Sequence, residues 1–200
     1  MARKSEHPQV KELLLQALET ERGGIQVYTA AIAAAQNEDL HKEWQGYLEE
    51  TRTHEQVLLR VFRELGLDPE ESSPGREVVA HLGAALVKAI KMARTSGTPE
   101  AAELVAAECV VLAETKDHQN WQLIGAIAEQ GGAGAAVLKS AFEAVEKDED
   151  HHLYHTMGWS RELWIQSLGM RAVLPPPEEQ KKVETAIGAA RAEKARDEYL

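Results

Sequence analysis

Apolar residues recur every three or four positions along most of this chain of 200 residues. That spacing places side chains on one face of an α-helix, whereas a half-buried β-strand requires strict alternation. Runs of alternating β-branched residues are almost absent, and the most frequent residues, Ala, Glu and Leu, include good helix formers. The sequence therefore predicts an all-α fold.

Caps and helix breakers divide the chain into five or six helices. The expected ranges are 8–36, 39–65, 76–95, 99–130 and 135–169, with a charged helix after the prolines at 175–177. Short links join the long helices in pairs, which predicts two antiparallel hairpins with the helix at 76–95 on the connection between them. We therefore expect a four-helix bundle with a crossover helix over residues 1–170, and a C-terminal helical extension over 171–200.

Charge and composition narrow the class of protein. The net charge is −11 and the Lys and Arg residues are scattered, which argues against a nucleic-acid partner. Cys109 is the single cysteine, so neither an intrachain disulfide nor a cysteine-based zinc site can form. The first residues lack an apolar signal segment, and no stretch approaches the ~20 apolar residues of a membrane span. We expect a cytoplasmic protein without a membrane partner.

The apolar stripes of the first two long helices are each interrupted near the middle. Glu21 follows Leu18 and precedes Ile25 at the spacing of the stripe, where an apolar residue is expected. In the second helix His54 holds the corresponding position, and Glu50 lies on the flank of the stripe one turn earlier. Since a buried charge needs a partner or a metal, these residues are candidates for a shared site.

The third and fourth long helices repeat this feature. Glu114 interrupts the third stripe, with His118 one turn later, although a different register would turn Glu108 inward. In the fourth helix Glu149 and His152 replace two apolar residues and form a Glu-x-x-His pair on one face. Because mid-helix positions of an antiparallel bundle lie at similar heights, the polar residues of all four helices are expected to converge.

Convergent carboxylates and imidazoles predict a metal site. Carboxylates can bridge two cations and imidazoles can complete their coordination, a mixed ligand set that suits iron or manganese. The candidate ligands are Glu21, Glu50, His54, Glu114, His118, Glu149 and His152. Each alone has a plainer interpretation as a solvated helix residue, above all Glu50. His151 and His155 are expected on the surface, and Tyr28 and Trp121 in ordinary core packing.

This arrangement resembles the ferritin-like superfamily, which carries Glu on its first and third helices and a Glu/His pair on its second and fourth. The spacings from Glu21 to Tyr28 and from Glu114 to Trp121 are similar to those of rubrerythrin and bacterioferritin. The resemblance covers roughly residues 10 to 165 and leaves the last segment uncovered.

The second helix carries the most specific part of the resemblance. Residues 47–69 are similar to the second helix of the YciE/YciF-type ferritin-like stress proteins. The diiron families have Glu-x-x-His there, but the residue three positions before His54 is Thr51. Either Glu50 reaches the site from one position earlier, or this helix supplies His54 alone and His118 adds a ligand from the third helix.

The resemblance implies two metal ions, iron or manganese with zinc as a substitute, in a carboxylate-bridged centre. It also implies an oxidoreductase acting on O2 or H2O2 in a stress response, as a ferroxidase, a peroxidase or a manganese-catalase-like enzyme. Because Thr51 stands where the family has Glu, a centre with a single metal ion or a degenerate centre is an alternative. The competing hypothesis is a non-catalytic helical stress or interaction protein with a metal-free polar core. Trp44, Trp159, Trp164 and the helix at 76–95 could form a dimer surface or core packing, and a homodimer is expected.

Overall fold

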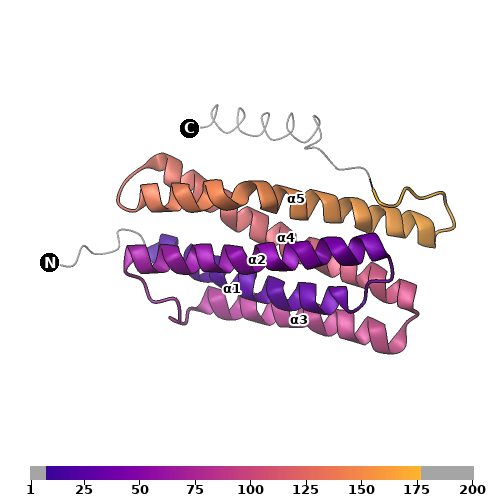
Figure 1. Ribbon diagram of the computed structural model, residues 1–200. Coiled ribbons are helices and arrows are strands. Elements are labelled where there is room, and N and C mark those ends of the chain that lie inside the picture. Colours follow the sequence, from indigo (N-terminus) through magenta and orange to yellow (C-terminus); the bar gives the residue numbers. More distant parts are fainter. Residues whose placement is uncertain (1–7, 177–200) are drawn as a thin grey trace, which may run out of the picture.

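The computed structural model describes residues 8–176, and within them it contains five α-helices and no β-strand. The helices are α1 (Pro8–Ile32), α2 (Glu38–Leu65), α3 (Pro74–Ser96), α4 (Pro99–Gln130) and α5 (Ala135–Ser167). Their long axes lie along roughly one common direction (Figure 1). The predicted all-α class is confirmed, whereas the charged helix predicted after residue 177 falls outside the described residues. None of the described helices is long and apolar enough to cross a membrane.

Side-chain caps explain where the helices begin. Asn37 Oδ1 accepts hydrogen bonds from two backbone N–H groups of the next turn, and α2 starts directly after it. Ser73 and Thr98 cap α3 and α4 in the same way, and each is followed by a proline. Because Ser73 is the cap, α3 begins at Pro74 rather than at residue 76 as the sequence pattern predicted.

The end of α1 differs from the prediction. The helix stops at Ile32, whereas the apolar pattern predicted it to continue to residue 36. The backbone N–H groups of Gln36 and Asn37 both donate to Glu103 Oε1 of α4, at 2.7 Å each. In a continued helix these groups would bond within α1 instead, so the buried Glu103 carboxylate fixes the α1–α2 link in a different conformation.

Contacts between helices place α1 and α4 at the centre of the packing. α1 packs against α2, α3 and α4, and α4 packs against α1, α3 and α5, with the most extensive contact between α4 and α5. α2 also contacts α5. Only Val79 and Ile90 of α3 are buried, and α3 approaches α1 closely where Gly83 faces Gly23. The core is therefore built mainly from α1, α2, α4 and α5, with α3 lying against α1 and α4.

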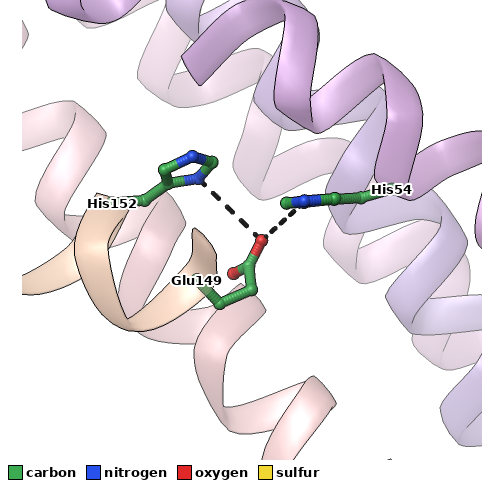
Figure 2. A group of neighbouring side chains, drawn as sticks. All are labelled: His54, Glu149 and His152. Atoms are coloured by element: carbon green, nitrogen blue, oxygen red, sulfur yellow. Dashed lines mark ion pairs between the residues drawn. The ribbon is translucent and has the colours of Figure 1, made fainter. Parts of the chain in front are cut away.

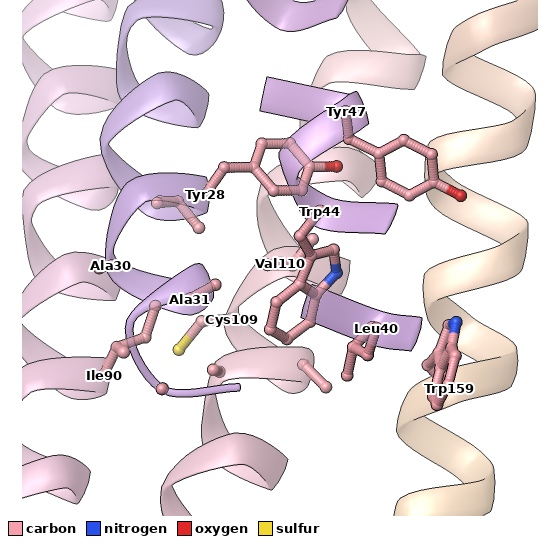
Figure 3. Close-up of a cluster of buried hydrophobic side chains, with 14 of the residues drawn as sticks. Tyr28, Ala30, Ala31, Leu40, Trp44, Tyr47, Ile90, Cys109, Val110 and Trp159 are labelled. Atoms are coloured by element: carbon pink, nitrogen blue, oxygen red, sulfur yellow. The ribbon is translucent and has the colours of Figure 1, made fainter. Parts of the chain in front are cut away.

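The apolar core is split into two clusters. The first, the Trp44 cluster, includes Tyr28, Leu40, Trp44, Val110 and Trp159 (Figure 3). The second, the Phe62 cluster, includes Leu18, Leu58, Phe62, Trp121 and Val145. Each of α1, α2, α4 and α5 contributes to both clusters, and on each helix a polar segment separates the two contributions. Trp44 and Trp159 thus belong to the core, whereas Trp164 is exposed.

Candidate metal centre

Six buried side chains form a polar layer between the two apolar clusters. They are Glu21 of α1, His54 of α2, Glu114 and Asp117 of α4, and Glu149 and His152 of α5. Each of them is at most 4 % exposed. Acids and histidines are rarely buried so deeply unless they are paired or bind a metal. What this layer can do therefore depends on the partners of these six side chains.

His54, Glu149 and His152 form the first of two groups with the spacing of metal ligands (Figure 2). His54 Nδ1 lies 2.8 Å from Glu149 Oε1, and His152 Nδ1 lies 3.9 Å from the same oxygen. Glu149 and His152 share one face of α5 because they are three residues apart, and His54 meets them from α2. Two imidazole nitrogens and one carboxylate oxygen thus face one another.

Glu21, Asp117 and Glu149 form the second group, in which one ligand atom of each residue lies within 4.8 Å of the others. Glu149 therefore belongs to both groups. Trp121 Nε1–H donates to Glu21 Oε1 at 2.8 Å, and Glu21 Oε2 lies 4.0 Å from His54 Nδ1. The indole was expected in ordinary core packing, but its N–H orients a carboxylate of the polar layer.

Glu114 lies beside the first group. Its Oε2 is 3.7 Å from His152 Nδ1, which is too long for a hydrogen bond. Tyr28 is buried next to this carboxylate, and burial together with the negative charge of Glu114 raises the pKa of the Tyr28 phenol well above its usual value. Tyr28 therefore remains a neutral hydroxyl at the edge of the layer.

The polar layer contains six buried polar atoms that have no hydrogen-bond partner. They are Glu21 Oε2, His54 Nδ1, Glu114 Oε2, Asp117 Oδ1, Glu149 Oε2 and His152 Nδ1. The short contact of His54 with Glu149 has the distance of an ion pair but lacks hydrogen-bond geometry. Leaving one such group unsatisfied costs about 1–3 kcal/mol, so six in one place indicate a common partner. A cation satisfies carboxylate oxygens and imidazole nitrogens at once, and these residues therefore fit a metal centre.

The negative charge of the layer is not balanced by lysine or arginine. Within residues 8–176 no Lys or Arg forms an ion pair with any of its four carboxylates. Burial and the charges of the neighbouring carboxylates raise the pKa values of Glu21, Asp117 and Glu149 well above their usual range. Without a cation, the layer therefore keeps protons on part of its carboxylates.

The surroundings shift the pKa values of the two histidines of the layer in opposite directions. Burial and the neighbouring His152 lower the pKa of His54. Burial also disfavours the charged form of His152, but the carboxylates of Glu114 and Glu50 outweigh this effect and raise the pKa of His152 to about 10. In the metal-free layer His152 is therefore the residue that carries a compensating positive charge.

Partly exposed carboxylates hold the outer nitrogens of both rings. Glu50 Oε2 lies 2.7 Å from His152 Nε2, and Asp148 Oδ2 lies 3.5 Å from His54 Nε2. The Glu50 side chain is 45 % exposed, so it meets His152 from the solvent side. A carboxylate at Nε2 favours a proton there, which leaves the Nδ1 lone pair available to a metal.

The structure brings together most of the ligands predicted from sequence. Glu21, His54, Glu149 and His152 belong to the two groups, and Glu114 lies next to His152. Like Glu114, the other two predicted ligands belong to neither group. Glu50 contacts the outer nitrogen of His152, and His118 Nδ1 lies 3.4 Å from Asp150 Oδ1 while its Nε2 is 2.8 Å from the Gln122 amide.

Asp117 is the layer residue that the sequence interpretation missed. The apolar spacing of α4 predicts Glu114 and His118 on the inward stripe, although Asp117 lies three residues after Glu114 and four before Trp121 and so also fits the spacing. Because α4 packs against α1, α3 and α5, a wide face of this helix is buried, and Asp117 and His118 are both inside. A search for acids three residues from an inward Glu would have found Asp117.

The prediction that His155 is exposed is wrong, whereas His151 is exposed as expected. His155 Nδ1 lies 2.8 Å from Glu43 Oε1, and Glu43 also accepts hydrogen bonds from Tyr47 and Trp159. Burial favours the neutral acid, but these hydrogen bonds outweigh it and hold the pKa of Glu43 below its usual value. This network belongs to the contact between α2 and α5 and lies beside the polar layer.

Similarity to known proteins does not assign this site, because no family model, curated protein or solved structure significantly matches the chain.

Proposed function

We propose that this chain is a ferritin-like, carboxylate-bridged dimetal protein that binds two divalent ions of iron or manganese in the polar layer. The observation that carries this proposal is that six buried ligand atoms without a hydrogen-bond partner come together from four helices, with Glu149 common to both ligand groups. Two divalent cations would neutralise the four carboxylates that no Lys or Arg pairs with in the described part of the chain. Zinc could occupy the same ligands as a substitute.

The helix packing supports a ferritin-like topology. The hairpins would be α1–α2 and α4–α5, each with extensive mutual contact, and α3 would be the crossover that lies against α1 and α4 (Figure 1). Two hairpins joined by one long connection is the arrangement used by ferritin-like folds, in which facing helices project Glu and His side chains inward. In such a bundle the ligands would project inward from the four long helices, as the side chains of the polar layer do.

The side chains divide into ligands and groups that position them. Glu149, common to both groups, is the proposed bridging carboxylate. His54 and His152 would bind through Nδ1, because Asp148 and Glu50 hold their Nε2 atoms. Three further carboxylates, those of Glu21, Glu114 and Asp117, complete the site, and the Trp121 indole positions Glu21.

Bound iron or manganese would supply the redox chemistry needed to act on O2 or H2O2 in a stress response. The chain would exclude bulk water from the ions with the Trp44 and Phe62 clusters, which flank the layer. Small molecules would approach from the side of Glu50 and Asp148, where the carboxylates around the layer are partly exposed. Tyr28 would contribute a neutral hydroxyl beside Glu114.

The direct test is metal analysis of protein purified from cells supplemented with iron or manganese. We expect about two ions per chain, and the loaded protein should consume O2 with Fe(II) or consume H2O2. Oxygen release from H2O2 by the manganese form would separate a catalase-like reaction from ferroxidase action. Metal content near zero after such loading would contradict the proposal and favour a metal-free stress or interaction protein.

The metal-free protein should become less stable as the pH rises from about 7 to about 9. His152 has a pKa raised from 6.5 to about 10 in the folded chain, so its contribution to stability is complete below 6.5 and is lost towards 10. The raised pKa values of Glu21, Asp117 and Glu149 act in the same direction, because the folded state keeps protons that the unfolded state releases.

Thermal unfolding followed by circular dichroism tests this pH dependence. The melting temperature of the metal-free chain should fall across this range, whereas the Mn2+-loaded chain, in which ions replace these protons, should change much less. His54 does not change the direction of this stability loss between pH 7 and 9, because its lowered pKa destabilises the fold only as the pH drops below about 6.5. A melting temperature that rises between pH 7 and 9 would contradict this interpretation of the layer.

A further inference from the structure

We propose that Asp117, together with Glu21 and Glu149, forms a histidine-free cation subsite that takes a hard divalent ion such as Mn2+. This inference rests on the proposed dimetal function and assigns one half of the centre to a residue outside the family pattern. Asp117 would supply the carboxylate that the second helix lacks at Thr51. The two halves of the centre would then differ in the metals they prefer.

The side chain of Asp117 meets the requirements of a ligand. It is buried, its Oδ1 has no hydrogen-bond partner, and it lies in the same group as Glu21 and Glu149. One oxygen of each of the other two carboxylates is also without a hydrogen-bond partner. Three buried carboxylates that each offer an oxygen within 4.8 Å of the others require either protons or a cation between them.

Thr51 cannot fill this role, and the packing around it explains why. Its hydroxyl donates to the Tyr47 carbonyl at 2.8 Å and is therefore occupied within α2. Its methyl group packs against the backbone of α1, because a Cβ built at Gly24 would lie 3.3 Å from Thr51 Cγ2. This close approach of α1 and α2 leaves little room for a longer acidic side chain, so a carboxylate from α4 takes its place.

The ligand chemistry of the two subsites differs. One group contains two imidazoles and one carboxylate, whereas the other contains carboxylates alone. His54 is a member of the first group only, and its Nδ1 lies 4.0 Å from Glu21 Oε2 of the second. Imidazole suits zinc and iron, and carboxylate oxygen suits magnesium and manganese. The oxygen-only subsite should therefore be the one that retains Mn2+ when Zn2+ is also present.

The test uses the full chain, stripped of metal, with Mn2+ and Zn2+ as probes. One equivalent of Zn2+ is added first, then Mn2+ is titrated while free Mn2+ is measured by EPR and bound metals by mass spectrometry. The variant is Asp117→Asn, which keeps the shape of the side chain but removes its charge. Glu103→Gln is the matched control, because Glu103 is a buried carboxylate of the same helix outside the polar layer. Circular dichroism checks that both variants fold.

We expect the unmodified chain and Glu103→Gln to hold one Zn2+ and one Mn2+. Asp117→Asn should keep the Zn2+ and bind Mn2+ at least about 100-fold more weakly. Equal Mn2+ binding by Asp117→Asn and the unmodified chain would overturn this inference and leave the dimetal proposal standing. An unmodified chain that binds neither metal would instead contradict the proposed function itself. Should Asp117→Asn not fold, a Zn2+ titration of the unmodified chain loaded with two Mn2+ ions decides: displacement of both Mn2+ ions at the same Zn2+ concentration would exclude two unlike subsites.

Discussion

Replacing Glu149 with Gln should abolish the binding of both metal ions while making the metal-free chain more stable. Glu149 is the residue common to the two groups, so its loss removes a ligand from each ion. In the metal-free layer the same carboxyl group lies among three other buried carboxyl groups, its pKa is raised by burial and by the neighbouring Glu114 carboxylate, and its Oε2 has no hydrogen-bond partner. Removing it should relieve a penalty of about 1–3 kcal/mol and raise the melting temperature by several degrees.

Metal analysis and thermal unfolding with and without Mn2+ measure both effects. Glu146→Gln is the matched control on α5, because Glu146 is exposed and should change neither the metal content nor the melting temperature. The opposite signs for binding and stability distinguish a ligand from a structural residue. A Glu149→Gln chain that is less stable without metal and still binds two ions would show that this carboxylate serves the fold.

Removing the metals from the loaded chain should lower its melting temperature by about 15 °C or more. Each ion contributes about 4 kcal/mol when its free concentration is about a thousandfold above the dissociation constant. For a domain of this size, each kcal/mol corresponds to about 2–4 °C. The effect is large because the ions bind only to the folded chain, where α1, α2, α4 and α5 bring the ligands together.

Calorimetry in the presence of Mn2+, before and after addition of a chelator, tests this expectation. Asp117→Asn, which should lose one ion, is expected to show about half the shift of the unmodified chain. Equal melting temperatures with and without metal would mean that the polar layer is stabilised by its internal contacts alone. That outcome would favour the hypothesis of a metal-free polar core.

The helices and the polar layer could be predicted from local sequence because both follow from spacing along one helix. Glu21, Glu149 and His152 replace apolar residues at regular steps, and all are buried. The cap at Thr98 was predicted for the same reason, whereas the cap at Ser73 was not. What a helix places on its own buried face can therefore be inferred without knowledge of its neighbours.

Features that depend on a second helix could not be predicted. The end of α1 is set by Glu103 of α4, which is distant in sequence. The burial of His155 depends on Glu43 of α2. Glu50 reaches the outer rather than the inner nitrogen of His152, and spacing alone does not distinguish these two positions.

The split core has a consequence for how the helices align. Every long helix contributes to the Trp44 cluster, the polar layer and the Phe62 cluster, so all four are fixed at the same height. A slip of one helix by a single turn, about 5.4 Å, would move a carboxylate such as Glu21 among apolar side chains and a leucine among the acids. An apolar core without this layer would tolerate such sliding far more readily. The residues proposed to bind metal would therefore also set the axial register of the fold before any ion arrives.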